Sequence, residues 1–216
     1  MKKKPIYFVS GIDTEVGKSY VTGYIARIWR EQGTRTITQK LVQTGNSGCS
    51  EDILLHRKIM GISLTEEDKL KLTMPEIFSY PASPHLAAEI DNRTIDFAKI
   101  EESTLQLSKR YDAVLLEGAG GLMVPLTRDY LTIDYIAEKK YPLILVTSGK
   151  LGSINHTLLS LEVIRSRKIP LEMLVYNLFP EDSDILIGKD SYQFFQRYLK
   201  EHFPDTLFLS VPPIIF

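Results

Sequence analysis

The feature that most constrains the fold is a glycine-bounded loop between a short apolar run and a helical pattern. The loop reads Gly-Ile-Asp-Thr-Glu-Val-Gly-Lys-Ser from Gly11 to Ser19 and follows the apolar run 6–9. Apolar side chains then recur at helical spacing between Tyr20 and Trp29. A strand, a loop ending in Lys-Ser and a helix form the layout of a phosphate-binding P-loop, in which backbone N–H groups and the helix dipole face an anion.

Lys18 and Ser19 carry the chemistry expected of such a loop. Lys18 would place a point charge on the β- and γ-phosphates, and the Ser19 hydroxyl would ligate Mg²⁺. The spacing is irregular, because five residues separate Gly11 from Gly17, whereas the usual pattern has about four. A chance Gly-Lys-Ser at an ordinary strand-to-helix turn is the alternative, and the flanking patterns disfavour it.

Composition limits the class of protein. With 216 residues, 44% of them hydrophobic, the chain fits one α/β domain with ample material for a core. The 26 Lys and Arg balance 27 Asp and Glu without a basic stripe, so no nucleic-acid partner is expected. The apolar stretch after lysines 2–4 is interrupted by Ser10 and Asp13, too soon for a signal peptide or membrane span. A lone Cys49, which we interpret as incidental and not as a nucleophile, excludes an internal disulfide, so we expect a cytoplasmic protein.

Apolar runs without alternating polarity recur along the chain. They lie at 36–42, 113–116, 143–147, 173–176 and 206–209, and helical patterns lie at 54–60, 84–90, 97–109, 133–139, 154–167 and 192–202. Such runs are typical of strands buried on both faces of a mostly parallel sheet. Ser83 is a candidate N-cap before Pro84, and Ser153 is one for the helix at Ile154. We therefore predict a single P-loop NTPase-like α/β domain over residues 1–216, with helices on both faces.

Ligands of such sheets gather at the carboxyl ends of the strands, so the residues that follow each run are the candidate site. Glu117 precedes the glycine-rich segment 118–121, which suits a metal ligand beside backbone that can approach phosphate, although a flexible turn is the alternative. Lys40 follows the second run, where a solvated and a functional lysine are equally compatible with the sequence. Asp52 could equally be an acid in the first turn of a helix.

Two later strand ends also carry polar groups. Segment 148–157 joins a strand to a helix, and its His156 has no second histidine or cysteine at metal spacing, which disfavours a zinc site. Asn177 could hydrogen-bond a nucleobase edge through its amide, although a strand-end asparagine is more often a turn former.

Taken together, these segments strongly resemble the dethiobiotin synthetase family, the ATP-dependent ring-closing enzymes of biotin synthesis. The resemblance runs in order from about 6 to 177 and rests on the loop, Lys40, the Glu-Gly-Ala-Gly-Gly segment, Ser-Pro-His at 83–85 and Lys-Leu-Gly-Ser-Ile-Asn-His at 150–156. The family shares the five-residue loop spacing, which removes the irregularity noted above.

The chain departs from the family pattern at four places. Ile12 and Ser19 each stand where the family has threonine, and the second change keeps the hydroxyl. The C-terminal segment 209–216 lacks the family's Gly-Glu. The Ser-Asp metal element appears as Ser-Glu-Asp, which leaves Glu51 or Asp52 as the ligand. Asp52 is favoured because the apolar residues after it match the expected helix.

By this resemblance the substrates are 7,8-diaminopelargonic acid, CO₂ and ATP, and the products are dethiobiotin, ADP and phosphate. An amine takes up CO₂ to give an N-carboxylated substrate, the carbamate attacks the γ-phosphate to give a carbamic-phosphoric anhydride, and the second amine closes the ureido ring. Because negative charge gathers beside the triphosphate, the reaction needs positioning and cations more than a protein nucleophile.

The resemblance also implies roles for individual residues and a homodimer with a composite active site. The implied catalytic residues are Lys40, Lys18, Thr14 and Glu15, and the Mg²⁺ ligands are Ser19, Asp52 and Glu117. The implied nucleotide site comprises Glu15, Val16, Gly17, Lys18, Ser19, Tyr20, Asp52, Glu117, Gly118, Ala119, Gly120, Asn177 and Pro212. In this site Asn177 would bind adenine. The implied substrate site comprises Thr14, Lys40, Thr44, Gly152, Ser153 and Asn155. Of these, the residues of segment 150–156 would reach from one subunit to its partner's substrate.

Three other functions compete with this interpretation. Partitioning or septum-positioning ATPases share the loop and sheet, but their loop has a lysine near the position of Asp13, and they commonly carry a membrane or DNA attachment element that this chain lacks. Amidotransferases acting on cobalamin precursors add a glutaminase domain, for which 216 residues leave no room. A relative that only binds nucleotide is disfavoured, because every proposed polar position is present.

Overall fold

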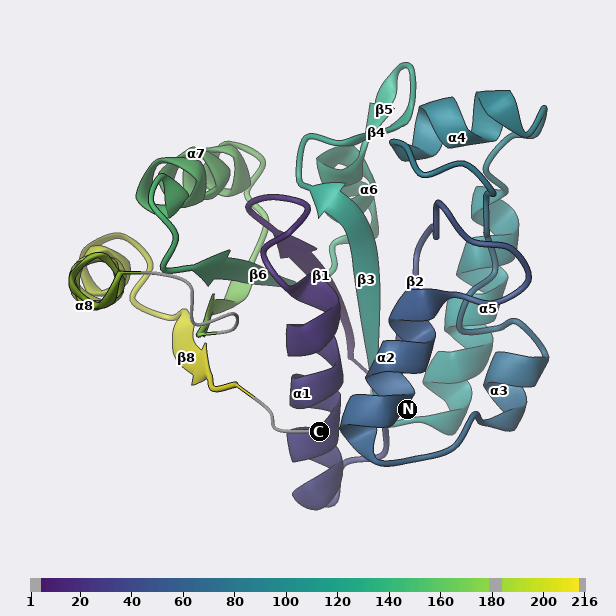
Figure 1. Ribbon diagram of the computed structural model, residues 1–216, viewed down its shortest axis with the longest axis horizontal. Coiled ribbons are helices and arrows are strands. Elements are labelled where there is room, and N and C mark those ends of the chain that lie inside the picture. The colour runs from purple at the N-terminus through teal and green to yellow at the C-terminus, as the bar shows by residue number, and fades with distance from the viewer. Residues whose placement is uncertain (1–4, 179–183, 214–216) are drawn as a thin grey trace.

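Six strands form a sheet in the order β2-β3-β1-β6-β7-β8, and every pairing in it is parallel (Figure 1). The computed structural model describes residues 5–178 and 184–213, so the lysines at 2–4 and the chain end at 214–216 lie outside the described residues. The sheet strands are β1 Ile6–Gly11, β2 Thr36–Lys40, β3 Ala113–Gly121, β6 Leu143–Ser148, β7 Leu171–Asn177 and β8 Leu207–Val211, and β4 Pro125–Thr127 pairs with β5 Tyr130–Leu131. The helices are α1 Lys18–Glu31, α2 Glu51–Met60, α3 Glu66–Lys69, α4 Pro84–Ile90, α5 Phe97–Arg110, α6 Thr132–Lys139, α7 Ser153–Ser166 and α8 Ile185–His202.

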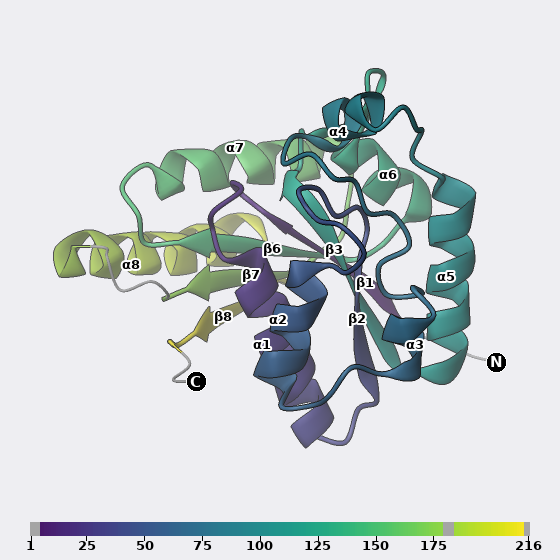
Figure 2. The ribbon, with the colours of Figure 1, turned by 45° about the vertical axis from the view of Figure 1, so that its right-hand side comes forward.

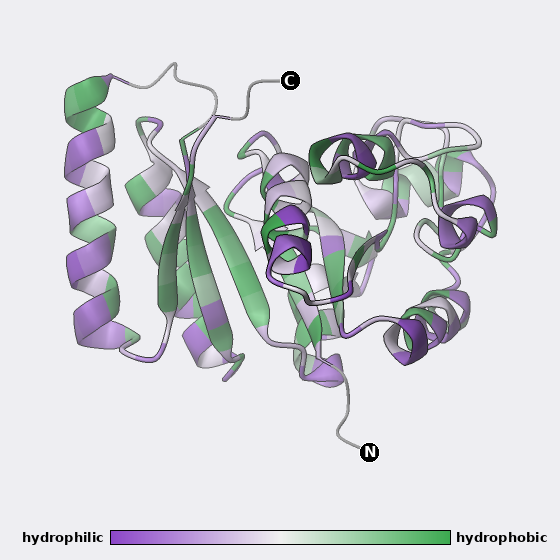
Figure 3. Ribbon diagram, turned by 90° about the horizontal axis from the view of Figure 1, so that it is seen from below, coloured by the Kyte–Doolittle hydropathy of each residue, from purple (hydrophilic) through white to green (hydrophobic). Residues whose placement is uncertain are grey.

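Alternate residues of each strand feed two separate cores, one on each face of the sheet. In β1, Phe8 belongs to the core under α5, α6, α7 and α8, whereas its neighbour Val9 belongs to the core under α1 and α2. Leu116 and Leu115 of β3 divide in the same way. Figure 2 shows α1 and α2 side by side on one face, and Figure 3 shows hydrophobic strands between helices with hydrophilic outer sides. This confirms the predicted α/β sheet with helices on both faces.

The sheet places the P-loop where the strand order reverses. β1 lies between β3 and β6, so the chain fills one side of the sheet with β2 and β3 and the other with β6 to β8. The carboxyl end of β1 is therefore a topological switch point, where open α/β sheets bind their ligands.

Several predicted boundaries were wrong. β3 does not end before Glu117 but continues to Gly121, so the glycine-rich segment is part of a strand and not a turn. α2 begins at Glu51, not at 54, because the Ser50 hydroxyl accepts the backbone N–H of Ile53. α8 begins at Ile185, not at 192, after an Asp184 cap.

The two predicted serine caps do not act as expected. Gly152, with φ of 95°, is the N-cap of α7, and Ser153 is its first helical residue, with its hydroxyl 3.0 Å from that of Ser148. Ser83 does occupy the N-cap position of α4 before Pro84, but its side chain makes no capping bond. In α7 a left-handed glycine therefore occupies the N-cap position that was expected for Ser153.

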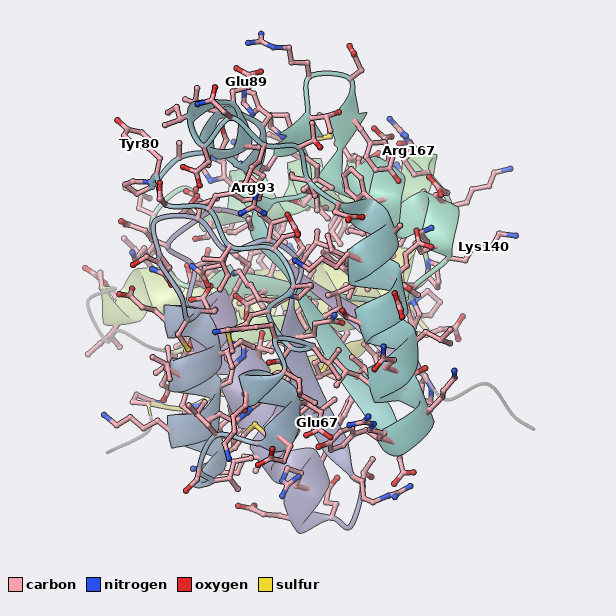
Figure 4. The ribbon with its side chains drawn as sticks, turned by 90° about the vertical axis from the view of Figure 1, so that its right-hand side faces the viewer. Glu67, Tyr80, Glu89, Arg93, Lys140 and Arg167 are labelled. Carbon is pink, nitrogen blue, oxygen red and sulfur yellow. The ribbon has the colours of Figure 1, made fainter. Side chains whose placement is uncertain are left out.

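Ion pairs join α3 to the end of α5, and join α4 to the β4–β5 hairpin. The carboxylate of Glu67, labelled beside the foot of α5 in Figure 4, accepts from Arg110 and Tyr111. At the other end of the molecule, Glu89 of α4 binds Arg128 beside the hairpin. Neither α3 nor the hairpin was predicted, because elements of only two to four residues give no periodic signal. Among the described helices, none is both long enough and apolar enough to cross a membrane.

Candidate active site

The P-loop joins β1 to α1 and is closed over its own lysine. The ammonium group of Lys18 donates to the carbonyl oxygens of Asp13 at 2.8 Å and Thr14 at 3.1 Å. A Cβ at Gly11 would lie 2.4 Å from Cγ1 of Val16, so the loop can wrap this tightly only with glycine there. Burial and repulsion from Lys40 lower the pKa of Lys18 to about 8, although nearby carboxylates oppose the shift.

A cluster of four polar side chains lies directly behind the loop, and in it Lys40 and Glu117 are buried whereas Ser19 and Asp52 are partly buried. The Ser19 hydroxyl is 2.8 Å from Oδ1 of Asp52 and 2.7 Å from Oε1 of Glu117. The Lys40 ammonium is 2.5 Å from Oδ2 of Asp52 and 2.8 Å from the same Oε1 of Glu117. Residues 19, 40, 52 and 117, which are widely separated in sequence, therefore meet at one point.

The charges of this cluster stabilise one another. Burial raises the pKa of Glu117, but Lys40 and His56 outweigh it and hold that pKa well below its usual range. Burial lowers the pKa of Lys40, but Glu117 and Asp52 raise it to about 12. The Lys40 side chain is only 6% exposed, so the solvated lysine is excluded as an interpretation.

Two structural features bring these residues together. The parallel register pairs Lys40 of β2 with Glu117 of β3, which sets their side chains side by side. α2 packs closely on α1 at Gly23, where a Cβ would lie 3.0 Å from Cβ of Ile59 and 3.2 Å from Cα of His56. This approach carries Asp52 to Ser19. Glu51, in contrast, is exposed, so the carboxylate that faces the cluster is that of Asp52.

The glycine-rich segment after Glu117 is shaped by packing. A Cβ at Gly118 would lie 2.9 Å from the Phe8 ring, and Gly120 has a φ of 64°. The register against β1 shifts here, from Val9 opposite Glu117 to Gly11 opposite Gly121. This bulge lets β3 pass the P-loop, and the Gly120 backbone lies near the Thr14 side chain.

The start of α7 faces the other side of the P-loop. A cavity of about 420 Å³ lies between them, lined by Ile12, Asp13, Thr14, Gly121, Leu122, Met123, Val124, His156, Leu159, Ser160 and Val163. A second cavity of about 120 Å³ adjoins Glu15, Lys150 and Ser153. Glu15, Gly152 and Asn155 are exposed at this edge. Thr44 lies in the loop between β2 and α2, and no hydrogen bond joins its side chain to the cluster.

The predicted nucleotide residues near the chain end lie against the opposite side of the loop. The Asn177 amide donates to the carbonyl oxygen of Val16 at 3.0 Å. The Tyr20 hydroxyl donates to the carbonyl oxygen of Pro212 at 2.9 Å. Both contacts hold the β7–β8 edge of the sheet against the P-loop and the first turn of α1.

Sequence reasoning missed three buried residues that support the cluster. His56 contacts Glu117, Thr38 contacts His56, and Arg57 contacts Thr38. The available signal was spacing: His56 lies one helical turn after Asp52, and Thr38 lies two residues before Lys40 on the same face of a strand.

The cluster offers oxygen ligands of the kind that Mg²⁺ prefers. Within the described residues, no group of three His, Cys, Asp or Glu side chains is placed to hold a metal by itself. Two carboxylates and the Ser19 hydroxyl converge instead, and Mg²⁺ is commonly bound by one or two carboxylates together with the phosphates of a substrate. The residues present therefore fit Mg²⁺ held jointly with a nucleotide.

Comparison with known sequences gives a consistent result. A family model described as an AAA domain matches residues 6–215. The chain is 53% identical over 203 residues to a protein of Pasteurella multocida named ATP-dependent dethiobiotin synthetase BioD 2, covering 94% of this chain and 95% of that one. It is 51% identical over 200 residues to ATP-dependent dethiobiotin synthetase BioD of Chlorobaculum tepidum, covering 93% and 83%.

Among solved structures, the chain resembles one described as a plasmid partition protein of Borrelia burgdorferi bound to AMPPNP. The TM-score is 0.59 at 13% identity, covering 99% of this chain and 88% of that one. At such identity the likeness shows a shared P-loop NTPase-like fold and nothing about activity.

Proposed function

This chain belongs to the ATP-dependent dethiobiotin synthetase family, and on that premise we propose that it closes the ureido ring of dethiobiotin from 7,8-diaminopelargonate, CO₂ and ATP. The observation that carries the proposal is the convergence of Ser19, Lys40, Asp52 and Glu117 behind a P-loop. As an ATP-consuming step of biotin biosynthesis, the reaction is proposed to run in the cytoplasm.

The proposed reaction has three balanced steps. One amine nitrogen bonds to the carbon of CO₂ and releases a proton, which gives a carbamate. A carbamate oxygen then bonds to the γ-phosphorus as the bond to ADP breaks. The second amine finally bonds to the carbamoyl carbon and releases a proton, as the bond from that carbon to the phosphate oxygen breaks and inorganic phosphate leaves. Negative charge accumulates in the second step, where cations fixed in advance contribute most.

The P-loop and the polar cluster behind it supply those cations. Lys18 already binds carbonyl oxygens at the mouth of the loop, and its ammonium would move to the β- and γ-phosphates. Lys40 is held as a cation by Asp52 and Glu117, so we assign it to the carbamate and the transferring phosphoryl group. Bound Mg²⁺ would neutralise phosphate charge, with Ser19, Asp52 and Glu117 as its protein ligands.

The cavity between the P-loop and α7 suits the diamine. Its lining is mostly apolar, with Thr14 at the loop end, as the aliphatic chain of a diamino fatty acid requires. Thr14, Thr44 and Glu15 would bind the reacting amines and the carbamate. Gly152, Ser153 and Asn155 at the start of α7 would bind the carboxylate end, where helix N-termini favour anions.

A homodimer would complete this site. Apolar side chains are exposed around the cavity mouth, with Leu151 87%, Leu159 58% and Met123 53% exposed. Exposed apolar groups gathered beside a polar site are typical of an interface. A second copy would cover them and bring its own 150–156 segment to the substrate.

The nucleotide base would lie at the β7–β8 edge. Asn177 and Pro212 both lie there, and Tyr20 links the C-terminal segment to α1. The Asn177 amide donates to the Val16 carbonyl oxygen, and we assign this side chain to the adenine base because an amide offers both donors and an acceptor beside the loop. The remaining loop residues, Glu15 to Tyr20 and 117–120, would surround the phosphates and the metal.

The test is formation of dethiobiotin, identified by mass, from diaminopelargonate, bicarbonate and Mg·ATP. We expect ADP to appear in equal amount to dethiobiotin and to fall sharply when the diamine is omitted. A nucleotide switch of the partitioning class would instead hydrolyse ATP at the same rate without the diamine. That outcome, or absence of product, would contradict the proposal.

A further inference from the structure

A chain of buried hydrogen bonds runs from α2 through β2 to the Glu117 carboxylate. The Arg57 guanidinium donates to Oγ1 of Thr38 at 2.7 Å, and that oxygen lies 3.0 Å from Nδ1 of His56. Nε2 of His56 lies 2.9 Å from Oε2 of Glu117. The side chains of His56 and Glu117 are both fully buried, so bulk water does not compete for the hydrogen bond between them.

The donors and acceptors in this chain fit together in one way. Glu117 forms an ion pair with Lys40 and a carboxylate only accepts, so Nε2 of His56 is the donor in this contact. Arg57 can only donate, so the Thr38 oxygen accepts from it, and the same hydroxyl lies 3.0 Å from Nδ1 of His56. Nε2 of His56 is therefore the nitrogen that donates to Glu117, and Nδ1 is the nitrogen that Thr38 orients.

The two oxygens of Glu117 consequently have separate tasks. Oε2 accepts from His56, whereas Oε1 accepts from Ser19 and Lys40. The bond from His56 stops rotation of the carboxylate about its last side-chain torsion, which is otherwise broad. Oε1 is thereby held toward the P-loop.

We propose that His56, oriented by Thr38, is a positioning residue that fixes the Glu117 carboxylate for Mg·ATP. This rests on the proposed function in one respect, the role of Glu117 at the metal. Carboxylates and histidines around metals depend on such outer partners, whose loss typically costs about 10- to 100-fold in metal affinity or activity. His56 touches no substrate in this account and acts only through Glu117.

The first test is calorimetric titration of ATP with Mg²⁺ and with EDTA, without diamine. The measured quantity is Kd for ATP in EDTA divided by Kd for ATP with Mg²⁺. This ratio is the gain in ATP affinity that the metal supplies, called the metal gain below. His56→Leu should reduce this gain about tenfold and leave Kd in EDTA unchanged. His56→Gln, whose amide N–H can replace Nε2–H, should restore most of the gain and of kcat.

The second test separates positioning from a structural role. Thr38→Val and His56→Leu should be non-additive in kcat, because both act through the same carboxylate. Thr104→Val is the matched control, since it removes a buried hydroxyl that binds Gln39 on the opposite face of β2. This control should lower stability while leaving kcat and the metal gain unchanged.

The outcomes distinguish failure of the positioning role of His56 from failure of the metal role of Glu117. A metal gain and kcat within about threefold of wild type in His56→Leu, well short of the usual loss, would overturn the inference if Glu117→Gln abolishes the gain. If Glu117→Gln also leaves the gain unchanged, the metal role of Glu117 itself fails. A lack of rescue by His56→Gln in a variant that folds like wild type would likewise reject the positioning role.

Discussion

At the scale of single residues, the Arg57–Asp68 pair anchors the support behind the site. Two guanidinium nitrogens of Arg57 donate to the two carboxylate oxygens at 2.9 and 2.8 Å, and the side chains are 3% and 1% exposed. Burial raises the pKa of Asp68, but hydrogen bonds from Arg57 and Thr73 outweigh it, so that pKa lies below its ordinary value. The pair holds Arg57 against Thr38, and it thereby supports the series of hydrogen bonds that ends at Glu117.

We expect Asp68→Asn to destabilise the protein by about 3 to 5 kcal/mol near neutral pH, because Arg57 then remains buried without a counter-charge. A depressed carboxylate pKa stabilises the fold above the unfolded value of about 3.9 and loses that contribution as the pH falls through the folded value. The difference between wild type and variant should therefore shrink below about pH 4. Urea unfolding across pH measures it.

Asp112→Asn is the matched control, because Asp112 pairs with Arg35 at the surface. Its effect should be small, since exposed pairs are screened by water and salt. Equal effects of the two substitutions would contradict the assigned role of Asp68.

At the scale of elements, the assembly of the site depends on the close contact between α1 and α2. Gly23 has no side chain at the point where α2 passes, so Asp52 and His56 can reach the P-loop side of the sheet. Ser50 fixes the start of α2, with its hydroxyl capping Ile53.

Gly23→Val should therefore act on stability and catalysis together. The added side chain would meet Ile59 and the His56 backbone, and overpacking of this kind costs about 1 to 3 kcal/mol. We also expect a lower kcat, because α2 must move away from Ser19. Gly23→Ala should also lower kcat, but by less than Gly23→Val. Unchanged kcat in the valine variant would show that the spacing of α1 and α2 is not critical. Urea midpoints and initial rates measure both.

The elements of this fold could be predicted from sequence where local signals were strong. The P-loop, the six strands and the long helices each have apolar runs or periodicity over many residues. Lys40 shows the limit: its neighbours Asp52 and Glu117 come from other elements, so only the assembled sheet decides that it is buried. His56 was missed for the same reason, because its spacing from Asp52 places both on one face of a helix but does not indicate that Glu117 of another strand will contact it.

At the scale of the whole molecule, the exposed apolar residues at the mouth of the cavity predict a dimer. Leu151→Asp would place a charge in the proposed interface, so we expect monomers in sedimentation at micromolar concentration and loss of activity. Leu186→Asp is the matched control, since Leu186 is 77% exposed on α8 and does not line the cavity. It should remain dimeric and active.

Asn155 tests whether the dimer shares its sites. Loss of one hydrogen bond to a charged group costs about 1.5 to 3 kcal/mol, so Asn155→Ala should raise KM for the diamine by roughly 10- to 100-fold while the dimer persists. A wild-type monomer with full activity would contradict a shared site.

The central claim is that Lys40, buried between Asp52 and Glu117, stabilises the transferring phosphoryl group. The most direct measurement is the rate of dethiobiotin formation by Lys40→Gln at saturating CO₂ and diamine, together with its Kd for ATP. Because the charge matters most in the transition state, the rate should fall by about 10²- to 10³-fold with little change in Kd. Lys69→Gln, at an exposed lysine on α3, should leave both unchanged. A Lys40→Gln rate within about threefold of wild type, far less than loss of such a contact costs, would contradict the account.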